Sequence, residues 1–126
     1  VGLDEKMPFI EHKIMGNRDE EATYGVAFSQ PHALEVVDVN GDGLVDIVTG
    51  KRLWAHGPTG DVEPNGTPVN YWFELQRRPL GVRFVPHLID DHSGLGVQVI
   101  ARDLTGDGRP DVLTASKLGT FLFRQK

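Results

Sequence analysis

Short apolar runs recur along the chain, and segments rich in Gly, Pro, Asn and Asp separate them. Branched and aromatic residues dominate these runs, and no run has the period of an amphipathic helix. The sequence therefore predicts about eight β-strands and no helix. The expected strands cover residues 9–14, 32–37, 47–50, 71–75, 82–89, 97–101, 112–115 and 120–123, with residues 51–56 as a further strand or its turn.

The expected strand at 97–101 is apolar on both faces, since Val97, Val99 and Ala101 alternate with Ile100. Such runs are typical of strands that are covered on both sides. A four-stranded sheet stacked between similar sheets, as in a β-propeller, provides that environment. About two such blades fit in this chain, whereas a closed ring needs about four to eight. The remaining blades must then come from a longer chain or from other copies.

One acidic pattern occurs twice, each time after an apolar run. Its side-chain oxygens stand at alternate positions, interrupted by two glycines, and belong to Asp38, Asn40, Asp42 and Asp46 in the first copy and to Asp103, Thr105, Asp107 and Asp111 in the second. Alternate oxygens on a tight loop can converge on one cation. Ca²⁺ fits best, because it accepts about six to eight oxygens in a flexible geometry. The sequence therefore predicts two Ca²⁺ sites.

The acidic loops also allow two other interpretations. Asp, Asn and Gly are ordinary turn residues, so each loop could be a turn without a metal. The EF-hand loop begins with the same spacing, but it needs a Glu at its twelfth position, where Thr49 and Thr114 stand. Pro110 also removes a backbone donor from the second loop, and the flanking runs have the composition of strands. A helical Ca²⁺ sensor is therefore disfavoured.

The chain contains an internal duplication. The pattern F-x-x-H-x-I occurs at Phe9–Ile14 and at Phe84–Ile89, and the extra residues of the first copy are expected in the polar stretch 16–24. Residues 1–126 are thus expected to form one propeller portion, with repeat 1 at about 9–83 and repeat 2 at about 84–126. His12 and His87 repeat in register, so each is expected to satisfy a backbone group of its blade. No role follows for His32.

Composition narrows the function classes. The net charge is −5, and two bound Ca²⁺ would bring it close to −1, so the metal ligands account for most of the acidity. No basic stripe favours nucleic acid, no apolar run reaches membrane-spanning length, and the absence of cysteine excludes disulfides and thiolate metal sites. The chain begins at Val1 without an initiator Met or a signal peptide, which suggests a piece of a longer protein.

The loop D-x-N-G-D-G-x-x-D, continued as D-I-V-T-G, resembles the FG-GAP/VCBS-type calcium-binding β-propeller repeats, a class that includes the integrin α-chain head. The F-x-x-H-x-I runs look like those of bacterial members. The resemblance covers residues 9–123, although the literal Phe-Gly and Gly-Ala-Pro signature is absent. It implies antiparallel four-stranded blades, structural Ca²⁺ completed by the Leu44 and Arg109 carbonyls, and an extracellular or periplasmic location.

A candidate ligand site lies around the long connection at residues 57–70, with the side chains of Arg52, Trp54, His56, Tyr71 and Trp72. Aromatic rings beside polar donors can form a platform for a sugar ring or a peptide side chain, and functional loops are usually carried by a rigid scaffold. The alternative is that both tryptophans pack between blades. The neighbouring carboxylates Asp90 and Asp91 are expected to mark a turn.

These patterns favour a calcium-binding β-propeller module without catalytic activity, which recognises carbohydrate or protein within a larger secreted protein. The sequence shows no Ser-His-Asp set, phosphate loop or H-E-x-x-H motif. The alternative is a propeller-fold enzyme acting on polysaccharide, as a lyase or hydrolase, with its site near Arg52–His56.

Overall fold

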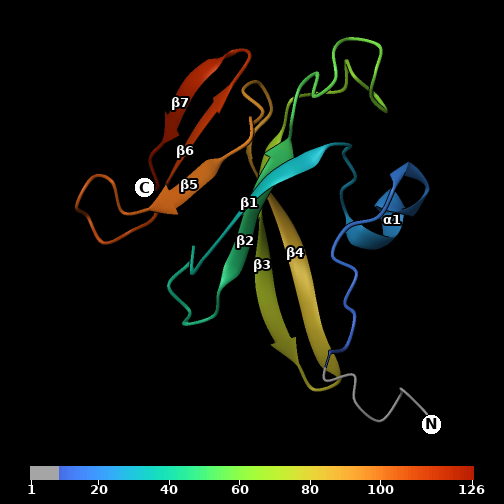
Figure 1. Cartoon of the computed structure of the whole chain (residues 1–126). Coiled ribbons are helices and arrows are strands. Elements are labelled where there is room, and N and C mark those ends of the chain that lie inside the picture. The colour runs from blue at the N-terminus through green and yellow to red at the C-terminus, as the bar shows by residue number, and fades with distance from the viewer. Residues whose placement is uncertain (1–8) are drawn as a thin grey trace, which may run out of the picture.

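The computed structural model describes residues 9–126, and its strands form two antiparallel sheets (Figure 1). The larger sheet has the order β1 (Pro31–Val37), β2 (Asp46–Lys51), β3 (Asn70–Arg78) and β4 (Gly81–Asp90). The smaller sheet has the order β5 (Val99–Arg102), β6 (Asp111–Ser116) and β7 (Gly119–Phe123). Within each sheet every strand pairs with its neighbour in sequence, so the all-β prediction is confirmed.

The segment before β1 differs from the prediction. Phe9–Ile14 is not a strand, and a 3₁₀ turn, η2 (Arg18–Glu20), and a short helix, α1 (Glu21–Tyr24), follow it. The helical turn forms because Asn17 and Glu20 make a reciprocal capping box, in which each side chain accepts a hydrogen bond from the other's backbone. The described residues thus hold seven strands and one short helix, where about eight strands and no helix were expected.

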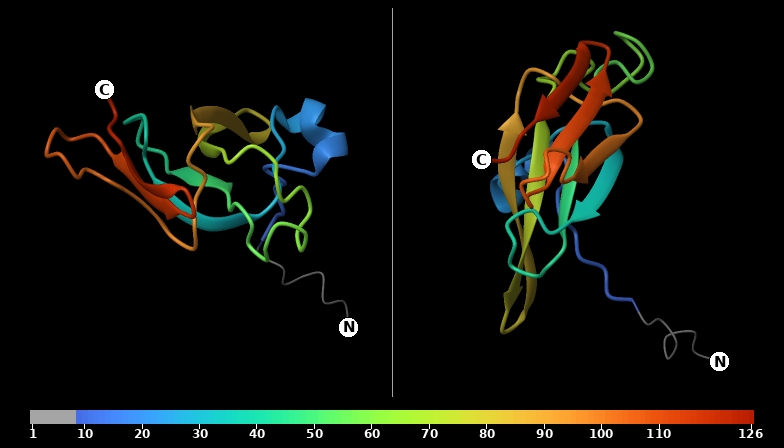
Figure 2. Two further views of the ribbon diagram at one scale, coloured as in Figure 1. Left: turned by 90° about the horizontal axis from the view of Figure 1, so that it is seen from above. Right: turned by 90° about the vertical axis from the view of Figure 1, so that its left-hand side faces the viewer.

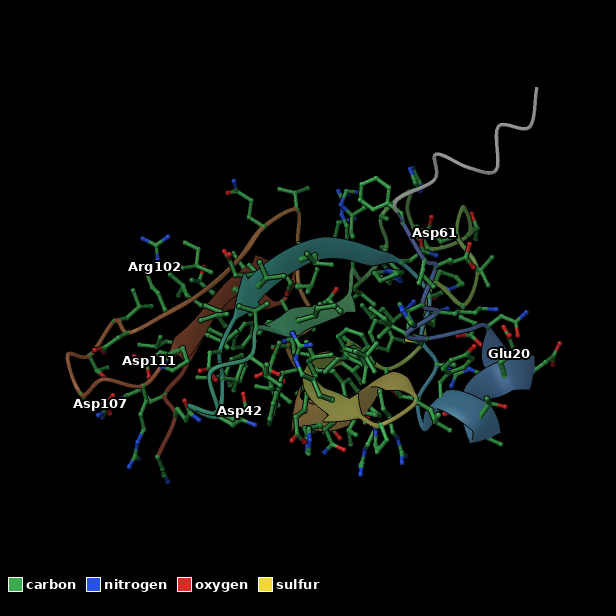
Figure 3. All side chains as sticks on the ribbon, turned by 90° about the horizontal axis from the view of Figure 1, so that it is seen from below. Glu20, Asp42, Asp61, Arg102, Asp107 and Asp111 are labelled. Atoms are coloured by element: carbon green, nitrogen blue, oxygen red, sulfur yellow. The ribbon has the colours of Figure 1, made fainter. Side chains whose placement is uncertain are left out.

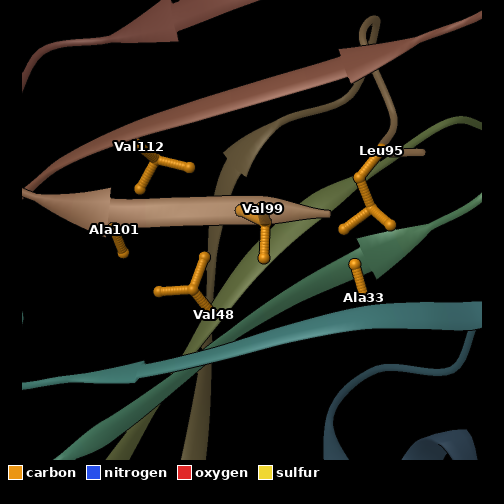
Figure 4. Packing of buried hydrophobic residues seen from close by; sticks show 6 residues of the cluster. All are labelled: Ala33, Val48, Leu95, Val99, Ala101 and Val112. Carbon is orange, nitrogen blue, oxygen red and sulfur yellow. The ribbon is translucent and has the colours of Figure 1, made fainter. Parts of the chain in front are cut away.

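The two sheets pack face to face. Ala33 and Val48 of the larger sheet meet Val99, Ala101 and Val112 of the smaller sheet in one buried cluster (Figure 4). The two sheets lie closest at β1 and β5, the first strand of each sheet, which contact each other across the interface. Viewed from above, the sheets lie at an angle to each other (Figure 2). The burial of Val99 and Ala101 confirms that β5 is covered on this face, whereas Val97, which was expected on the same face, lies before the strand and is 63% exposed.

A second cluster covers the opposite face of the larger sheet. Val26 and Phe28, which follow α1, pack on Phe73 of β3, and Ile14 and Ile47 lie at the edge of this cluster. The polar excursion that the sequence suggested at residues 16–24 is therefore followed by an apolar strap across the sheet. Because of this strap, β2 and β3 are covered on both faces.

The sheets are offset from the sequence repeats. They span residues 31–90 and 99–123, so β4 crosses the expected repeat boundary near residue 83. The second F-x-x-H-x-I run lies in β4, the outermost strand of the larger sheet. β2 ends at Lys51, and residues 53–56 form turns, which is one of the two forms expected there. Among the described residues, no helix is long and apolar enough to cross a membrane.

Candidate metal centres and the opposite loop

The acidic loops connect β1 to β2 and β5 to β6, and both project from the same end of the sheets (Figure 1). Asp42 lies on the first loop, and Asp107 and Asp111 belong to the second, whereas Asp61 lies in a different part of the molecule (Figure 3). The strands on both sides of each loop confirm that neither belongs to an EF-hand. Thr49 and Thr114, at the twelfth positions, lie in β2 and β6, where they donate hydrogen bonds to the backbone oxygens of Ala33 and Gly94.

The first acidic loop is organised around the carboxylate of Asp38. Its Oδ1 accepts a hydrogen bond from the Gly41 amide at 2.7 Å, and its Oδ2 accepts one from the Gly43 amide at 2.8 Å. Asp42 Oδ1 accepts a hydrogen bond from the Leu44 amide at 2.8 Å. The chain therefore turns tightly around these carboxylates, and Asn40 also lies inside the turn, with its Nδ2 3.2 Å from Asp42 Oδ2.

The second acidic loop has the same hydrogen bonds. Asp103 accepts from the amides of Gly106 at 2.6 Å and Gly108 at 2.8 Å, and Asp107 Oδ1 accepts from the Arg109 amide at 3.0 Å. These amides, chiefly that of Gly108, lower the pKa of the Asp103 carboxyl below its ordinary value of 3.8 and keep it ionised.

Left-handed glycines make both turns feasible. The backbone φ is +77° and +85° at Gly41 and Gly43, and +79° and +84° at Gly106 and Gly108. No atom outside the neighbouring residues would lie within 4 Å of an added Cβ at any of the four. Glycine is therefore required by the backbone conformation and not by crowding.

The last carboxylate of each pattern ties its loop to a segment later in the sequence, which the sequence did not predict: Asp46 to β3 and Asp111 to the residues after β7. Asp46 has no exposed surface, and its two oxygens accept from the amides of Val39 at 2.9 Å and Leu75 at 2.8 Å. Asp111 is equally buried and accepts from the amide of Gln125 at 3.1 Å. Asp111 also accepts from the Leu104 and Thr105 amides of its own loop, so each carboxylate joins its loop to a backbone amide later in the sequence.

The oxygens of each loop suit a hard cation, although its three carboxylates are not gathered closely. Among residues 9–126, the one group of three carboxylate or imidazole ligand atoms that all lie within 4.8 Å of one another is Asp90, Asp91 and His92. That group is exposed apart from Asp90, whose carboxylate accepts from the amides of His92 and Ser93 and from the Ser93 hydroxyl. The prediction that Asp90 and Asp91 mark a turn is confirmed.

The structure separates the five expected ligand residues. Tyr71 stacks on Phe28 with ring centroids 5.8 Å apart, beneath the strap. Trp72 stacks on His87 at 4.3 Å and packs against the cluster between the sheets. Neither aromatic residue joins Arg52, Trp54 and His56, which lie on the turn after β2. The packing alternative therefore holds for Trp72 but not for Trp54, which lies outside both clusters.

The repeated histidines do not share the expected role. His87 Nε2 lies 2.9 Å from Glu74 Oε2, so its partner is a side chain and not a backbone group. His12 is exposed on the segment before α1. The prediction of one backbone-binding histidine in each blade is therefore wrong. His32 Nε2 lies 3.0 Å from Arg52 Nη1, a contact that links β1 to the turn.

A His–Asp pair on the turn after β2 was not predicted. His56 Nδ1 lies 2.6 Å from Asp61 Oδ1, and the His56 amide donates to Asp61 Oδ2 at 2.8 Å. The amide of His56 and, to a smaller extent, its ring lower the pKa of Asp61 below the ordinary value of 3.8. Lys117, from the β6–β7 turn, donates to the Trp54 carbonyl. Trp54 and Lys117 are 63 residues apart, so no local pattern could have indicated this contact.

No protein-family model matches this chain, and neither the curated proteins nor the solved structures include a significant match.

Proposed function

We propose that the chain is a portion of a calcium-stabilised β-propeller and acts as a recognition module within a larger secreted protein. The observation that carries the calcium proposal is the agreement between the two loops. The same atoms of Asp38 and Asp103 accept from the same loop positions, although the residues between them differ, with Asn40 in one loop and Thr105 in the other. A shared geometry despite different residues supports a shared ligand.

Ca²⁺ suits these loops because all the donors are oxygens and the glycines leave the turn adaptable. On this proposal, the ligands are the ten residues expected from the sequence, namely Asp38, Asn40, Asp42, Leu44, Asp46, Asp103, Thr105, Asp107, Arg109 and Asp111, with Leu44 and Arg109 contributing their carbonyls. The metal stabilises the fold by drawing each set of three carboxylates together. Binding free energy therefore appears as folding free energy. Extracellular or periplasmic Ca²⁺ would keep such sites filled.

The propeller proposal rests on the faces that the sheets leave open. A shift of 65 residues superposes the acidic loops, and it pairs Val99 and Ala101 with Leu34 and Val36. The first pair is buried against the larger sheet, whereas Leu34 and Val36 are 63% and 53% exposed. Leu34 and Val36 therefore lie on the face of the larger sheet that points away from the smaller sheet, and they are the counterparts of the residues by which the smaller sheet packs.

The smaller sheet also carries apolar residues on its outer face, one of them at a position that is buried in the larger sheet. Ile100, Leu113 and Leu122 form one cross-strand row on the face that points away from the larger sheet. Leu113 corresponds to Val48, which is buried between the sheets. We therefore propose that a further sheet of the same kind covers this row, and that another covers the exposed β1 positions of the larger sheet, beside the strap. The proposed partners are the remaining blades of a longer chain or of other copies.

Thermal unfolding tests the calcium proposal. Saturating Ca²⁺ should raise the stability by about 2.7 kcal/mol per site at a hundredfold excess over Kd, relative to the protein in chelator. Mg²⁺ at the same concentration is the control, because it gives up its waters reluctantly and should stabilise less. An unchanged midpoint on adding Ca²⁺ would refute the proposal.

The second candidate function is a polysaccharide-acting enzyme with its site near Arg52–His56. The His56–Asp61 pair favours it, because a carboxylate that orients an imidazole is a common arrangement in general-base catalysis. A glycan panel separates the two functions. Binding without chain cleavage supports the recognition module, and depolymerisation that His56→Ala abolishes supports the enzyme.

A further inference from the structure

Several polar groups lie on the turn after β2 or contact it, at the end of the sheets opposite the acidic loops. The turn contributes Arg52, Trp54 and His56, β1 contributes His32, and the β6–β7 turn contributes Lys117. Arg52 Nη1 lies 3.0 Å from His32 Nε2, and Lys117 Nζ donates to the Trp54 carbonyl. Both sheets therefore supply side chains to this turn.

Arg52 and Lys117 have hydrogen-bond donors to spare. A guanidinium has five N–H donors and an ammonium has three, whereas the side-chain contacts of Arg52 and Lys117 are with an imidazole nitrogen and a carbonyl. Within residues 9–126, neither cation lies within 4.0 Å of a carboxylate. Arg18 differs, since its guanidinium pairs with Glu21 and Glu63. Arg52 and Lys117 thus remain available to an anion.

His56 is held in place by Asp61. Both oxygens of Asp61 hold it, one through the ring Nδ1 at 2.6 Å and one through the backbone amide at 2.8 Å. The Asp61 side chain is 3% exposed, whereas that of His56 is 75% exposed. When Nδ1–H donates to the carboxylate, the neutral ring exposes the lone pair of Nε2, which can accept a hydroxyl proton.

Trp54 contributes a ring that is held in place. Its indole Nε1–H donates to Asn65 Oδ1 at 3.1 Å, and its backbone φ is +49°, in the left-handed region that few non-glycine residues adopt. A fixed aromatic ring beside hydrogen-bonding groups can support the apolar face of a sugar.

The nearby carboxylates are already occupied within the protein. Asp61 binds His56, Glu63 pairs with Arg18, and Asp90 caps its own turn. Asp91 contacts His92 and lines a different hollow of the surface. Among the described residues, none of these four therefore neutralises Arg52 or Lys117.

We propose that this turn binds an acidic saccharide, with a uronate sugar as the ligand. Arg52 and Lys117 donate to the carboxylate, His56 Nε2 accepts from a ring hydroxyl, and Trp54 supports the ring. This inference rests on the recognition role proposed above and names its ligand class. It is independent of the metal sites, because the acidic loops lie at the other end of the strands.

Titration of the isotope-labelled protein with D-galacturonate and D-glucuronate, followed by NMR, tests the inference. D-Galactose and D-glucose are the matched neutral ligands, because each has a hydroxymethyl group in place of the carboxylate. We expect the uronates to bind at least about tenfold more tightly, since hydrogen bonds to charged groups are the stronger kind. Shifts should be concentrated at the Trp54, His56 and Lys117 amides. Equal binding of uronate and neutral sugar, or no binding of any of the four, would overturn the proposal.

Three variants assign the contacts. Arg52→Gln and Lys117→Gln should each weaken uronate binding by about tenfold or more, and weaken binding of the neutral sugars less. Arg77→Gln is the control, because Arg77 is an exposed cation near the β3–β4 turn, at the opposite end of the sheet. A uronate affinity that neither site variant reduces would also overturn the proposal.

Asp61→Asn tests the positioning of His56. The wild-type ring should be the Nδ1–H tautomer by nitrogen NMR, and the variant should shift towards Nε2–H and lose hydroxyl recognition. An unchanged tautomer would contradict the role given to Asp61. All titrations are made in saturating Ca²⁺ with the fold verified by circular dichroism, so that failure of the sugar site cannot be confused with failure of the calcium sites.

Discussion

Replacement of Asp46 by Asn should separate the two roles that the structure and the proposal give to this carboxylate. As a structural group, Asp46 joins the first acidic loop to β3 through the amides of Val39 and Leu75, with no exposed surface. As a proposed ligand, it contributes charge to the metal site. Asn keeps the shape of the side chain but presents an NH₂ group where one of these two backbone donors needs an acceptor.

The size of the effect follows from these contacts. In chelator, one buried hydrogen bond to a charged acceptor is lost and one backbone amide is left unpaired, so Asp46→Asn should lower the free energy of unfolding by about 2–3 kcal/mol. In saturating Ca²⁺ the variant should also forgo the stabilisation from its own site, about 2.7 kcal/mol at a hundredfold excess over Kd. The total loss is then about 5 kcal/mol.

Urea unfolding of the wild type and the variant, each in chelator and in Ca²⁺, measures both effects. Asp111→Asn is the matched variant, because Asp111 is equally buried and accepts from the Gln125 amide at the equivalent position. If the variant loses the same stability in both conditions, Asp46 is not a ligand. If it loses less than about 0.5 kcal/mol in chelator, the value typical of surface substitutions, the structural reasoning is wrong.

The first acidic loop should bind Ca²⁺ about tenfold more tightly than the second, a difference of roughly 1.4 kcal/mol. The Asn40 amide oxygen is a better metal ligand than the Thr105 hydroxyl, and Arg109 adds a positive charge to the second loop. Calorimetric titration of Asp42→Ala and Asp107→Ala, each of which keeps one intact loop, measures both affinities, and equal affinities would refute the ranking. Arg18 lowers the pKa of Glu63 below its ordinary value of 4.5, so their contact stabilises the fold fully above that pH and less as the pH falls through the folded pKa. The difference in unfolding free energy between wild type and Glu63→Gln should therefore shrink from about pH 6 to about pH 3. A difference that stays constant over this range would contradict the contact.

The strands beside the acidic loops were predictable because their signals are local. Branched apolar runs such as Ile47–Gly50 adjoin Asp- and Gly-rich turns, and both features act within a few residues. The boundaries agree with β2 and β6 to within two residues. The tight turn around Asp38 likewise follows from its own glycines. The third-strand contacts of Asp46 were not predictable, because Leu75 lies 29 residues away.

The predicted strand at Phe9–Ile14 does not form, although its sequence pattern repeats in β4. The same F-x-x-H-x-I pattern forms part of β4, where β3 offers a paired edge along nine residues. Among the described residues, no edge is paired with the first copy, and Phe9 is 83% exposed. The pattern therefore specifies which residues suit a strand, whereas a neighbouring strand decides whether one forms. Tyr71 and Trp72 illustrate the same point, since alternation places them on opposite faces and only tertiary packing decides what covers each.

The exposed apolar positions are best understood through the internal symmetry. A sheet face with exposed Leu34 and Val36 invites unwanted association in an isolated domain. The equivalent Val99 and Ala101 are buried in the same molecule, so this pattern already has a defined partner, namely the opposite face of another such sheet. That opposite face is in turn open on the smaller sheet, at Leu113 and its row. On the propeller proposal, the row at Leu113 and the exposed β1 positions Leu34 and Val36 are complementary surfaces, and further sheets of the same kind would cover both beside the strap formed by Val26 and Phe28.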